Sequence, residues 1–202
     1  MKVAGQEILK LYGAQVLTRG IDLLVSSIGL FTDDDILSQF IEITEKTGAK
    51  MSLSAGALPG IDWMSATSFS KVNDISIIQT KPVESWKNTP AETFIDLNAI
   101  KTPTCFFEGS AREAMNIFTK SSNITAMLAL ATIGLDHIKV KLVADPINSI
   151  MNTAIHFDSE VGELEINLKG VPSFENPSTS AEVPLSIIKT IRNISSTISY
   201  GV

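Results

Sequence analysis

The chain has 202 residues, 44% of them hydrophobic and 19% charged, which is enough to bury one substantial core or two small ones. Its formal net charge of −6 and its scattered lysines and arginines leave no basic surface for a phosphate backbone, so nucleic acid is not an expected partner. The N-terminus lacks an apolar signal core, and the longest apolar run, ITAMLALATIG, is shorter than the roughly 20 residues that cross a bilayer. We therefore expect a cytoplasmic protein with no membrane contact.

Residues 1–56 alternate between helix and strand patterns, as parallel sheets with crossover helices do. An amphipathic helix is predicted over residues 6–19 and strands over 22–26 and 50–53. Between the strands, a helix capped by Thr32 is expected to run to about Gly48. The apolar face predicted for the first helix consists of Ile8, Leu11, Tyr12, Gln15 and Val16.

Three consecutive aspartates, Asp33 to Asp35, fall in the first turn of the predicted second helix. Carboxylates at this end are stabilised by unpaired backbone N–H groups and by the helix dipole. A metal cluster is the competing interpretation, but consecutive helix positions point in different directions and cannot converge on one ion. No metal site is therefore predicted.

The rest of the chain follows a different pattern. Helices are predicted over 57–69, 110–120, 123–134 and 178–194, and strands over 73–82, 105–109, 137–145, 151–157 and 162–168. The last helix carries an apolar stripe of Val183, Ile187, Ile188, Ile191 and Ile194 and is expected to pack back on the first module.

The predicted fold class is thus α/β plus α+β. Residues 1–56 form the C-terminal part of a Rossmann-type parallel sheet, 57–178 an α+β domain with a mixed sheet, and 179–202 a C-terminal helix. The single cysteine, Cys105, lies in the apolar run TCFFEG, where we expect a buried core thiol rather than a nucleophile, because no base neighbours it.

Seven ordered segments together resemble the L-aspartate dehydrogenase family: VSSIGLFTDDDIL, SLSAGALPGID, QTKPVESW, FEGSAREAMNIF, NITAMLALATIGLDHIKVKLVADP, GELEINLKGVPS and ENPSTSAEVPLSIIKTIRN. The resemblance implies a Rossmann domain followed by an α+β catalytic domain, and a homodimer formed through the sheet. It also implies NAD- or NADP-dependent oxidative deamination of L-aspartate through iminoaspartate, which can feed nicotinamide nucleotide synthesis.

The family begins with a strand, a G-x-G-x-x-G turn and a helix, and no G-x-G-x-x-G occurs in this sequence. We therefore expect the chain to begin after the first Rossmann half, which leaves an unpaired apolar edge on strand 22–26 or 50–53. NAD and NADP are not distinguished, since the residue that contacts the ribose would lie in that half.

Four residues are candidates for cofactor or substrate contact. By resemblance, Ala57 and Asn123 match positions that contact NAD in the family. Asn123 also precedes an apolar helical run, where asparagine is a good N-cap. Gly109 and Ser110 open a predicted helix whose N–H groups would receive a substrate carboxylate, with a simple tight turn as the alternative.

The family's proposed acid/base is a histidine on the strand after ADP, and an ungapped alignment puts Thr153 at that position. His156 lies three residues further along, about 10 Å on an extended strand, and alternation puts it on the other face from Thr153. His156 is the candidate catalytic residue if a bulge rotates it, and a solvated or hydrogen-bonded strand histidine if not. His137, at a strand start, is a weaker candidate.

Three functions follow from these observations. The first is an aspartate dehydrogenase acting on L-aspartate with NAD or NADP. The second is a non-catalytic, dimeric homologue that binds a metabolite or partner. The third is a related dehydrogenase for another amino or keto acid.

Overall fold

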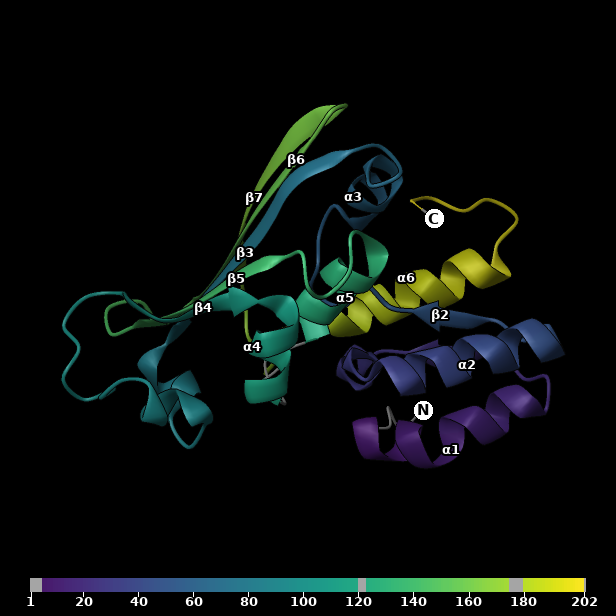
Figure 1. The fold of residues 1–202 in the computed structure, drawn as a ribbon, viewed down its shortest axis with the longest axis horizontal. Coiled ribbons are helices and arrows are strands. Elements are labelled where there is room, and N and C mark those ends of the chain that lie inside the picture. The colour runs from purple at the N-terminus through teal and green to yellow at the C-terminus, as the bar shows by residue number, and fades with distance from the viewer. Residues whose placement is uncertain (1–4, 120–122, 175–179, 202) are drawn as a thin grey trace.

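A computed structural model describes residues 5–119, 123–174 and 180–201, and Figure 1 shows its arrangement. It contains a two-stranded parallel sheet, β1-β2, and a mixed five-stranded sheet of order β4-β5-β3-β6-β7. Within these ranges, no helix is both long enough and apolar enough to cross a membrane. The predicted combination of an α/β part and an α+β part with a C-terminal helix is confirmed. The predicted boundary between 178 and 179 lies outside the described residues.

The N-terminal unit forms the two-stranded sheet and its helices. Its elements are α1 (Gln6–Thr18), β1 (Leu23–Val25), the 3-10 helix η1 (Ile28–Thr32), α2 (Asp34–Thr47) and β2 (Met51–Leu53). β1 and β2 pair in parallel, from Leu23 opposite Met51 to Val25 opposite Leu53. Within the described residues, each of these strands pairs along one edge only.

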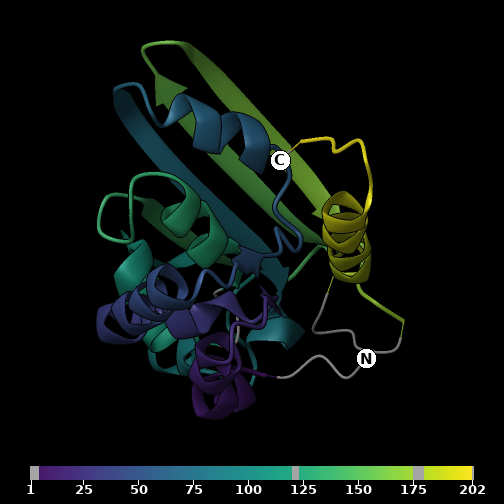
Figure 2. The ribbon, with the colours of Figure 1, turned by 90° about the vertical axis from the view of Figure 1, so that its right-hand side faces the viewer.

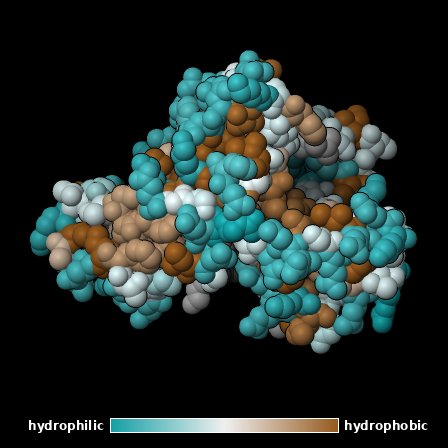
Figure 3. All heavy atoms as spheres, in the orientation of Figure 1, coloured by the Kyte–Doolittle hydropathy of each residue, from teal (hydrophilic) through white to brown (hydrophobic). Residues whose placement is uncertain are grey.

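The buried face of α1 differs from the predicted one. Leu9, Gly13 and Leu17 are buried, whereas most of the predicted apolar face is exposed. The reason is Gly13, since a Cβ there would lie 2.8 Å from the Phe40 ring of α2. The two helices therefore approach through the glycine, and hydrophobic side chains remain at the surface over α1 (Figure 3).

The cap of α2 is Asp33 rather than Thr32. The Asp33 carboxylate accepts hydrogen bonds from the N–H groups of Asp35 and Ile36, at 3.1 and 3.2 Å. Thr32 instead ends η1, where its hydroxyl donates to the Gly29 carbonyl. The helix ends as predicted at Gly48, whose φ of 73° is favourable only for glycine and a few polar residues.

The second unit contains the larger sheet. Its elements are α3 (Ile61–Thr67), β3 (Val72–Pro82), η2 (Val83–Trp86), η3 (Pro90–Thr93), β4 (Thr104–Ser110), α4 (Ala111–Ile117), α5 (Asn123–Ala131), β5 (Lys139–Asp145), β6 (Met151–Ser159), β7 (Gly162–Gly170) and α6 (Val183–Ser195). β3 pairs with β5 in parallel, and the other three pairings are antiparallel.

The two faces of the larger sheet have different surroundings. Helices α3, α4 and α5 lie on one face (Figures 1 and 2), where Ile77, Ile155 and Phe157 are buried. Trp63 of α3 packs edge-on against Phe157, with ring centroids 5.5 Å apart. The other face is polar and carries cross-strand ion pairs, such as Lys139 with Asp74 at 2.6 Å.

Cys105 is exposed, so the prediction of a buried core thiol is wrong. It lies on β4, which is an edge strand of the five-stranded sheet. The register between β4 and β5 shifts between Cys105 and Phe107. The apolar run therefore has half-buried Phe106 and Phe107 beside an exposed Cys105.

The C-terminal helix α6 contacts the loop that follows β2, where Ser186 bonds Ser54 and Gly56. Fewer residues of α6 are buried than the predicted apolar stripe implies. Ile187 is buried, whereas Ile188, Ile191 and Ile194 are exposed. One hydrophobic cluster of buried residues joins both units, from Leu9 of α1 to Phe157 of β6. The N-terminal unit and the larger sheet therefore share a core.

Candidate functional site

A cleft of about 780 Å³ lies between the two sheets. It is lined by residues just past the carboxyl ends of β1 and β2, by the ends of β3, β6 and β7, and by the first turns of α5 and α6, which meet near the centre of Figure 1. In open α/β sheets, ligands bind outside the carboxyl ends of the strands. Both predicted cofactor-contact residues, Ala57 and Asn123, line this cleft.

The loop after β2 is held by α6. The Ser186 hydroxyl accepts a hydrogen bond from the Gly56 N–H at 2.8 Å and bonds the buried Ser54 hydroxyl at 2.5 Å. Gly56 has a φ of 63°, a conformation that glycine adopts without strain. The loop that carries Ala57 is therefore fixed in position by the C-terminal helix.

Asn123 joins the two units at the cleft. It is the first residue of α5, and its side-chain oxygen accepts a hydrogen bond from the Gly29 N–H in η1, at 3.1 Å. The Asn123 side chain therefore links α5 to η1. Asn123 is also exposed and lines the cleft, so a ligand can reach it.

Lys81 is a cleft residue that sequence reasoning missed. It ends an apolar strand, directly before Pro82, and lies with its Nζ 4.9 Å from the centroid of the buried Trp86 ring. Burial lowers the pKa of Lys81 to about 8. The sequence does contain a sign of this residue, since the strand run SIIQTKP carries a single lysine. A cation seldom occupies a half-buried strand without a partner or a function.

Thr153 and Asn152 begin the part of β6 that borders the cleft. Thr153 lies directly opposite Gln79 of β3, so both side chains share one face of the sheet. Gln79 is buried and donates to the Thr125 hydroxyl at 2.8 Å. The buried side-chain oxygen of Asn152 has no hydrogen-bond partner within the described part of the chain.

Comparison with known proteins identifies the family. The family described as "Aspartate dehydrogenase, C-terminal" matches residues 62–194. L-aspartate dehydrogenase from Psychrobacter cryohalolentis is 35% identical over 189 residues, which cover 94% of this chain and 72% of that protein. The chain belongs to the L-aspartate dehydrogenase family. By this resemblance it is an oxidoreductase.

Two further relatives agree with this assignment. L-aspartate dehydrogenase from Acinetobacter baumannii is 36% identical over 193 residues, covering 96% of this chain and 73% of that protein. The crystal structure of aspartate dehydrogenase from Thermotoga maritima superposes with a TM-score of 0.80 at 27% identity, covering 98% of this chain and 75% of that one. The L-aspartate dehydrogenase fold is therefore present across the described residues.

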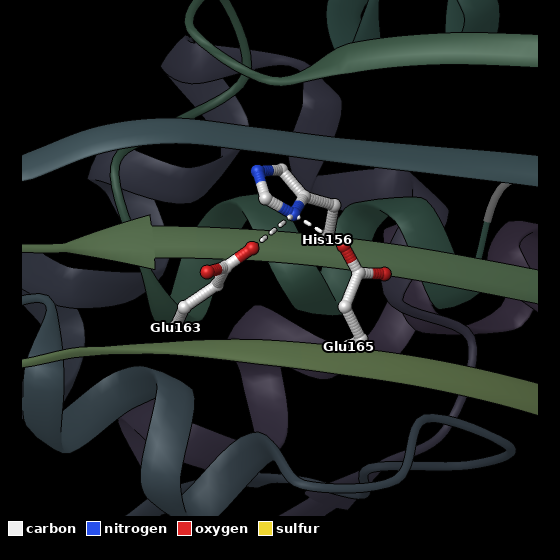
Figure 4. Close-up of side chains that lie close together, drawn as sticks. All are labelled: His156, Glu163 and Glu165. Carbon is white, nitrogen blue, oxygen red and sulfur yellow. Dashed lines mark hydrogen bonds and ion pairs between the residues drawn. The ribbon is translucent and has the colours of Figure 1, made fainter.

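His156 is not among the residues that line the cleft. Its Nδ1 lies 2.6 Å from a carboxylate oxygen of Glu165, its direct cross-strand neighbour, and 3.7 Å from Glu163 (Figure 4). These three side chains are the one group in the described chain close enough to suggest a metal, and exposed ion pairing on a hairpin accounts for the arrangement. The geometry supports the interpretation of His156 as a hydrogen-bonded strand histidine. Thr153, in contrast, lines the cleft.

The N–H groups at Gly109 and Ser110 offer little to a substrate. Ser110 caps α4 in a capping box, donating its N–H to Glu113 at 2.7 Å and accepting from the Glu113 N–H. The next two N–H groups, of Ala111 and Arg112, donate to backbone carbonyls. Neither Gly109 nor Ser110 lines the cleft. This supports the alternative interpretation, a structural turn.

Proposed function

We propose that the protein catalyses the NAD- or NADP-dependent oxidative deamination of L-aspartate. A bound nicotinamide would supply the acceptor for the C2 hydride, and the amine would lose a proton, which leaves the C=N bond of iminoaspartate. Water then adds to the imine, which releases ammonia and oxaloacetate. The observation that supports the proposal is that Ala57 and Asn123, which are expected by resemblance to contact the cofactor, line the same cleft as Thr153 and Lys81.

The residues of the cleft fit a nicotinamide and an amino acid. Ala57 and Asn123 would contact the nicotinamide ring, which supplies the hydride acceptor when the cofactor is bound. The chain itself holds the loop at Gly56, orients the substrate and excludes water from one side of the reacting carbon.

Thr153 sets the expected rate. A threonine hydroxyl does not take up a proton near neutral pH, and a positioned acid/base contributes about 10²- to 10⁴-fold. The proton that leaves the amine must then pass to water or to another group of the cleft. We therefore expect slow turnover compared with a member that carries the histidine.

Initial rates test this function. The purified protein is assayed for loss of NADH or NADPH absorbance with ammonium and oxaloacetate, and separately with ammonium and pyruvate, 2-oxoglutarate or glyoxylate. The proposal requires oxaloacetate to give the highest kcat/KM, and the NADH to NADPH ratio fixes the cofactor. A preference for another keto acid would support the related dehydrogenase instead.

The position of Thr153 also favours a second candidate, a non-catalytic dimeric homologue that binds a metabolite. No turnover with any keto acid, together with retained dicarboxylate binding, would establish it. In either case we propose a homodimer that uses the polar sheet face of β3, β5, β6 and β7, a cytoplasmic location and a supply of iminoaspartate to nicotinamide nucleotide synthesis. Light scattering of the purified protein measures the dimer directly.

A further inference from the structure

We propose that Lys81 is the residue that binds a carboxylate of the dicarboxylate substrate. This inference rests on the proposed function for the identity of the substrate, and on the structure for the site. Among the described residues that line the cleft, Lys81 is the one cation and Glu182 the one anion. A substrate with two carboxylates requires at least one cationic partner if it is to leave water for a half-buried site.

The strand register places Lys81 on the same face of the sheet as Thr153, where the substrate is proposed to react. Thr153 lies opposite Gln79, and alternation places Lys81 on the same face two residues further along β3. Lys81 and Thr153 are thus diagonal cross-strand neighbours, which lie about 7 to 8 Å apart in such sheets. A four-carbon dicarboxylate spans such a separation, so one carboxylate reaches Lys81 while C2 stays near Thr153.

The Trp86 ring holds the ammonium group of Lys81 in position. After Lys81, Pro82 ends β3 and the chain turns through η2, which brings the buried Trp86 beneath Lys81. The indole N–H donates to the Val143 carbonyl at 3.1 Å, which anchors the ring to β5. A cation over an indole face is stabilised by the ring quadrupole. Lys81 is therefore pre-oriented rather than a mobile surface lysine.

Burial makes this site sensitive to pH. Because burial lowers the pKa of Lys81 to about 8, the ammonium is lost in alkali sooner than that of a surface lysine. Among the described residues, Glu182 of α6 lines the same cleft and its carboxylate accepts from Ser180, and Asp145, held by Asn148, lies opposite Pro82 at the end of β5. The pKa of Lys81 therefore lies within the alkaline range in which binding can be measured.

Isothermal titration with succinate, a dicarboxylate that cannot be oxidised at an amine, tests the assignment without turnover. We expect Lys81→Met to weaken succinate binding about 10- to 100-fold, as the loss of one charged hydrogen bond does. Lys81→Arg should retain most of the affinity. Lys141→Met is the matched control, because Lys141 lies on the opposite face of the sheet, paired with Glu108. Butyrate, with one carboxylate, should bind weakly to all four proteins.

The pH profile separates binding from proton transfer. Succinate affinity of the wild-type protein should fall about tenfold per pH unit above the Lys81 pKa, and the fall should be absent in Lys81→Arg. Unchanged succinate affinity in Lys81→Met, or a wild-type protein that does not bind succinate, would overturn the proposal. Reduced kcat with unchanged affinity would make Lys81 a proton carrier and also overturns it. Lys81-dependent succinate binding without aspartate turnover would instead refute only the proposed reaction.

Discussion

The Ser186 hydroxyl of α6 accepts a hydrogen bond from the Gly56 N–H, 2.8 Å away, across 130 residues of sequence. This bond attaches the C-terminal helix to the loop that carries Ala57. Ser186→Ala should lower the free energy of unfolding by about 1 to 2 kcal/mol, because the Gly56 N–H loses its partner. It should also raise the Kd for NADH or NADPH, since the loop is no longer held.

Urea unfolding and cofactor titration by fluorescence measure the two effects. Ser195→Ala is the control, because Ser195 is exposed in the last turn of the same helix. If Ser186→Ala lowered stability but left cofactor affinity at the wild-type value, the loop would not be part of the nicotinamide site.

The positions of Thr153 and His156 lead to opposite predictions for two substitutions. Thr153→His introduces an imidazole into the cleft and should raise kcat about 10- to 100-fold, toward the range of a positioned acid/base. His156→Gln removes an imidazole that does not line the cleft and should change kcat less than about threefold, since it loses only an exposed pair with Glu165.

Steady-state kinetics at several pH values check both variants, with circular dichroism to confirm folding. A large loss of kcat in His156→Gln would show that β6 rotates His156 into the site, contrary to the described register. An inactive but folded Thr153→His would mean that the cleft has no room for the imidazole.

Asp145 shapes the turn that leads into the cleft strand β6. Its carboxylate accepts from the N–H groups of Ile147 and Asn148 and from the Asn148 side chain. Burial alone would raise the pKa of Asp145, but the hydrogen bonds from Asn148 and Ile147 outweigh it and lower the pKa. The ionised form is therefore the one that stabilises the fold.

Asp145→Asn should lower the free energy of unfolding at neutral pH by about 1 to 3 kcal/mol. The folded-state pKa is below the unfolded value, so this contribution is present above the unfolded pKa and is lost as pH falls through the folded one. Denaturant melts should show wild type and variant converging below about pH 4. Glu45→Gln, at an exposed position of α2 outside its first turn, is the control. A difference that persisted in acid would contradict this account.

Gly13 governs the contact between α1 and α2. In Gly13→Ala the new Cβ would lie 2.8 Å from the Phe40 ring, so the helices must separate. We expect a loss of about 1 to 3 kcal/mol in the free energy of unfolding, as for overpacked cores, despite the higher helix propensity of alanine. Lys10→Ala, at an exposed site, should have little effect. A more stable Gly13→Ala protein would exclude the tight contact.

The type of most elements could be predicted from the local sequence, but the buried face of a helix could not. The end of α2 at Gly48 and the alternation of β6 follow from backbone preference and side-chain period. The buried face of α1 depends on Phe40 fitting against Gly13, a contact between helices that a one-dimensional pattern does not contain. Likewise, Cys105 is exposed because β4 lies at a sheet edge, which depends on the order of strands.

The site could be predicted only where a family motif or an anomalous residue marked it. Ala57 and Asn123 were inferred from resemblance, and both line the cleft. The place of Lys81 in the cleft could not be predicted, because it depends on Trp86 folding back beneath Lys81 and on Thr153 lying one strand away. The helix-opening residues Gly109 and Ser110 have a suitable local pattern, yet the neighbouring Glu113 occupies the Ser110 N–H.

A crystal structure of the protein with NADH or NADPH and succinate tests the central claim most directly. The account predicts the nicotinamide against Ala57 and Asn123, with the dicarboxylate between Thr153 and Lys81. Density for either ligand outside the cleft, or a carboxylate placed at Ser110 instead of Lys81, would contradict it.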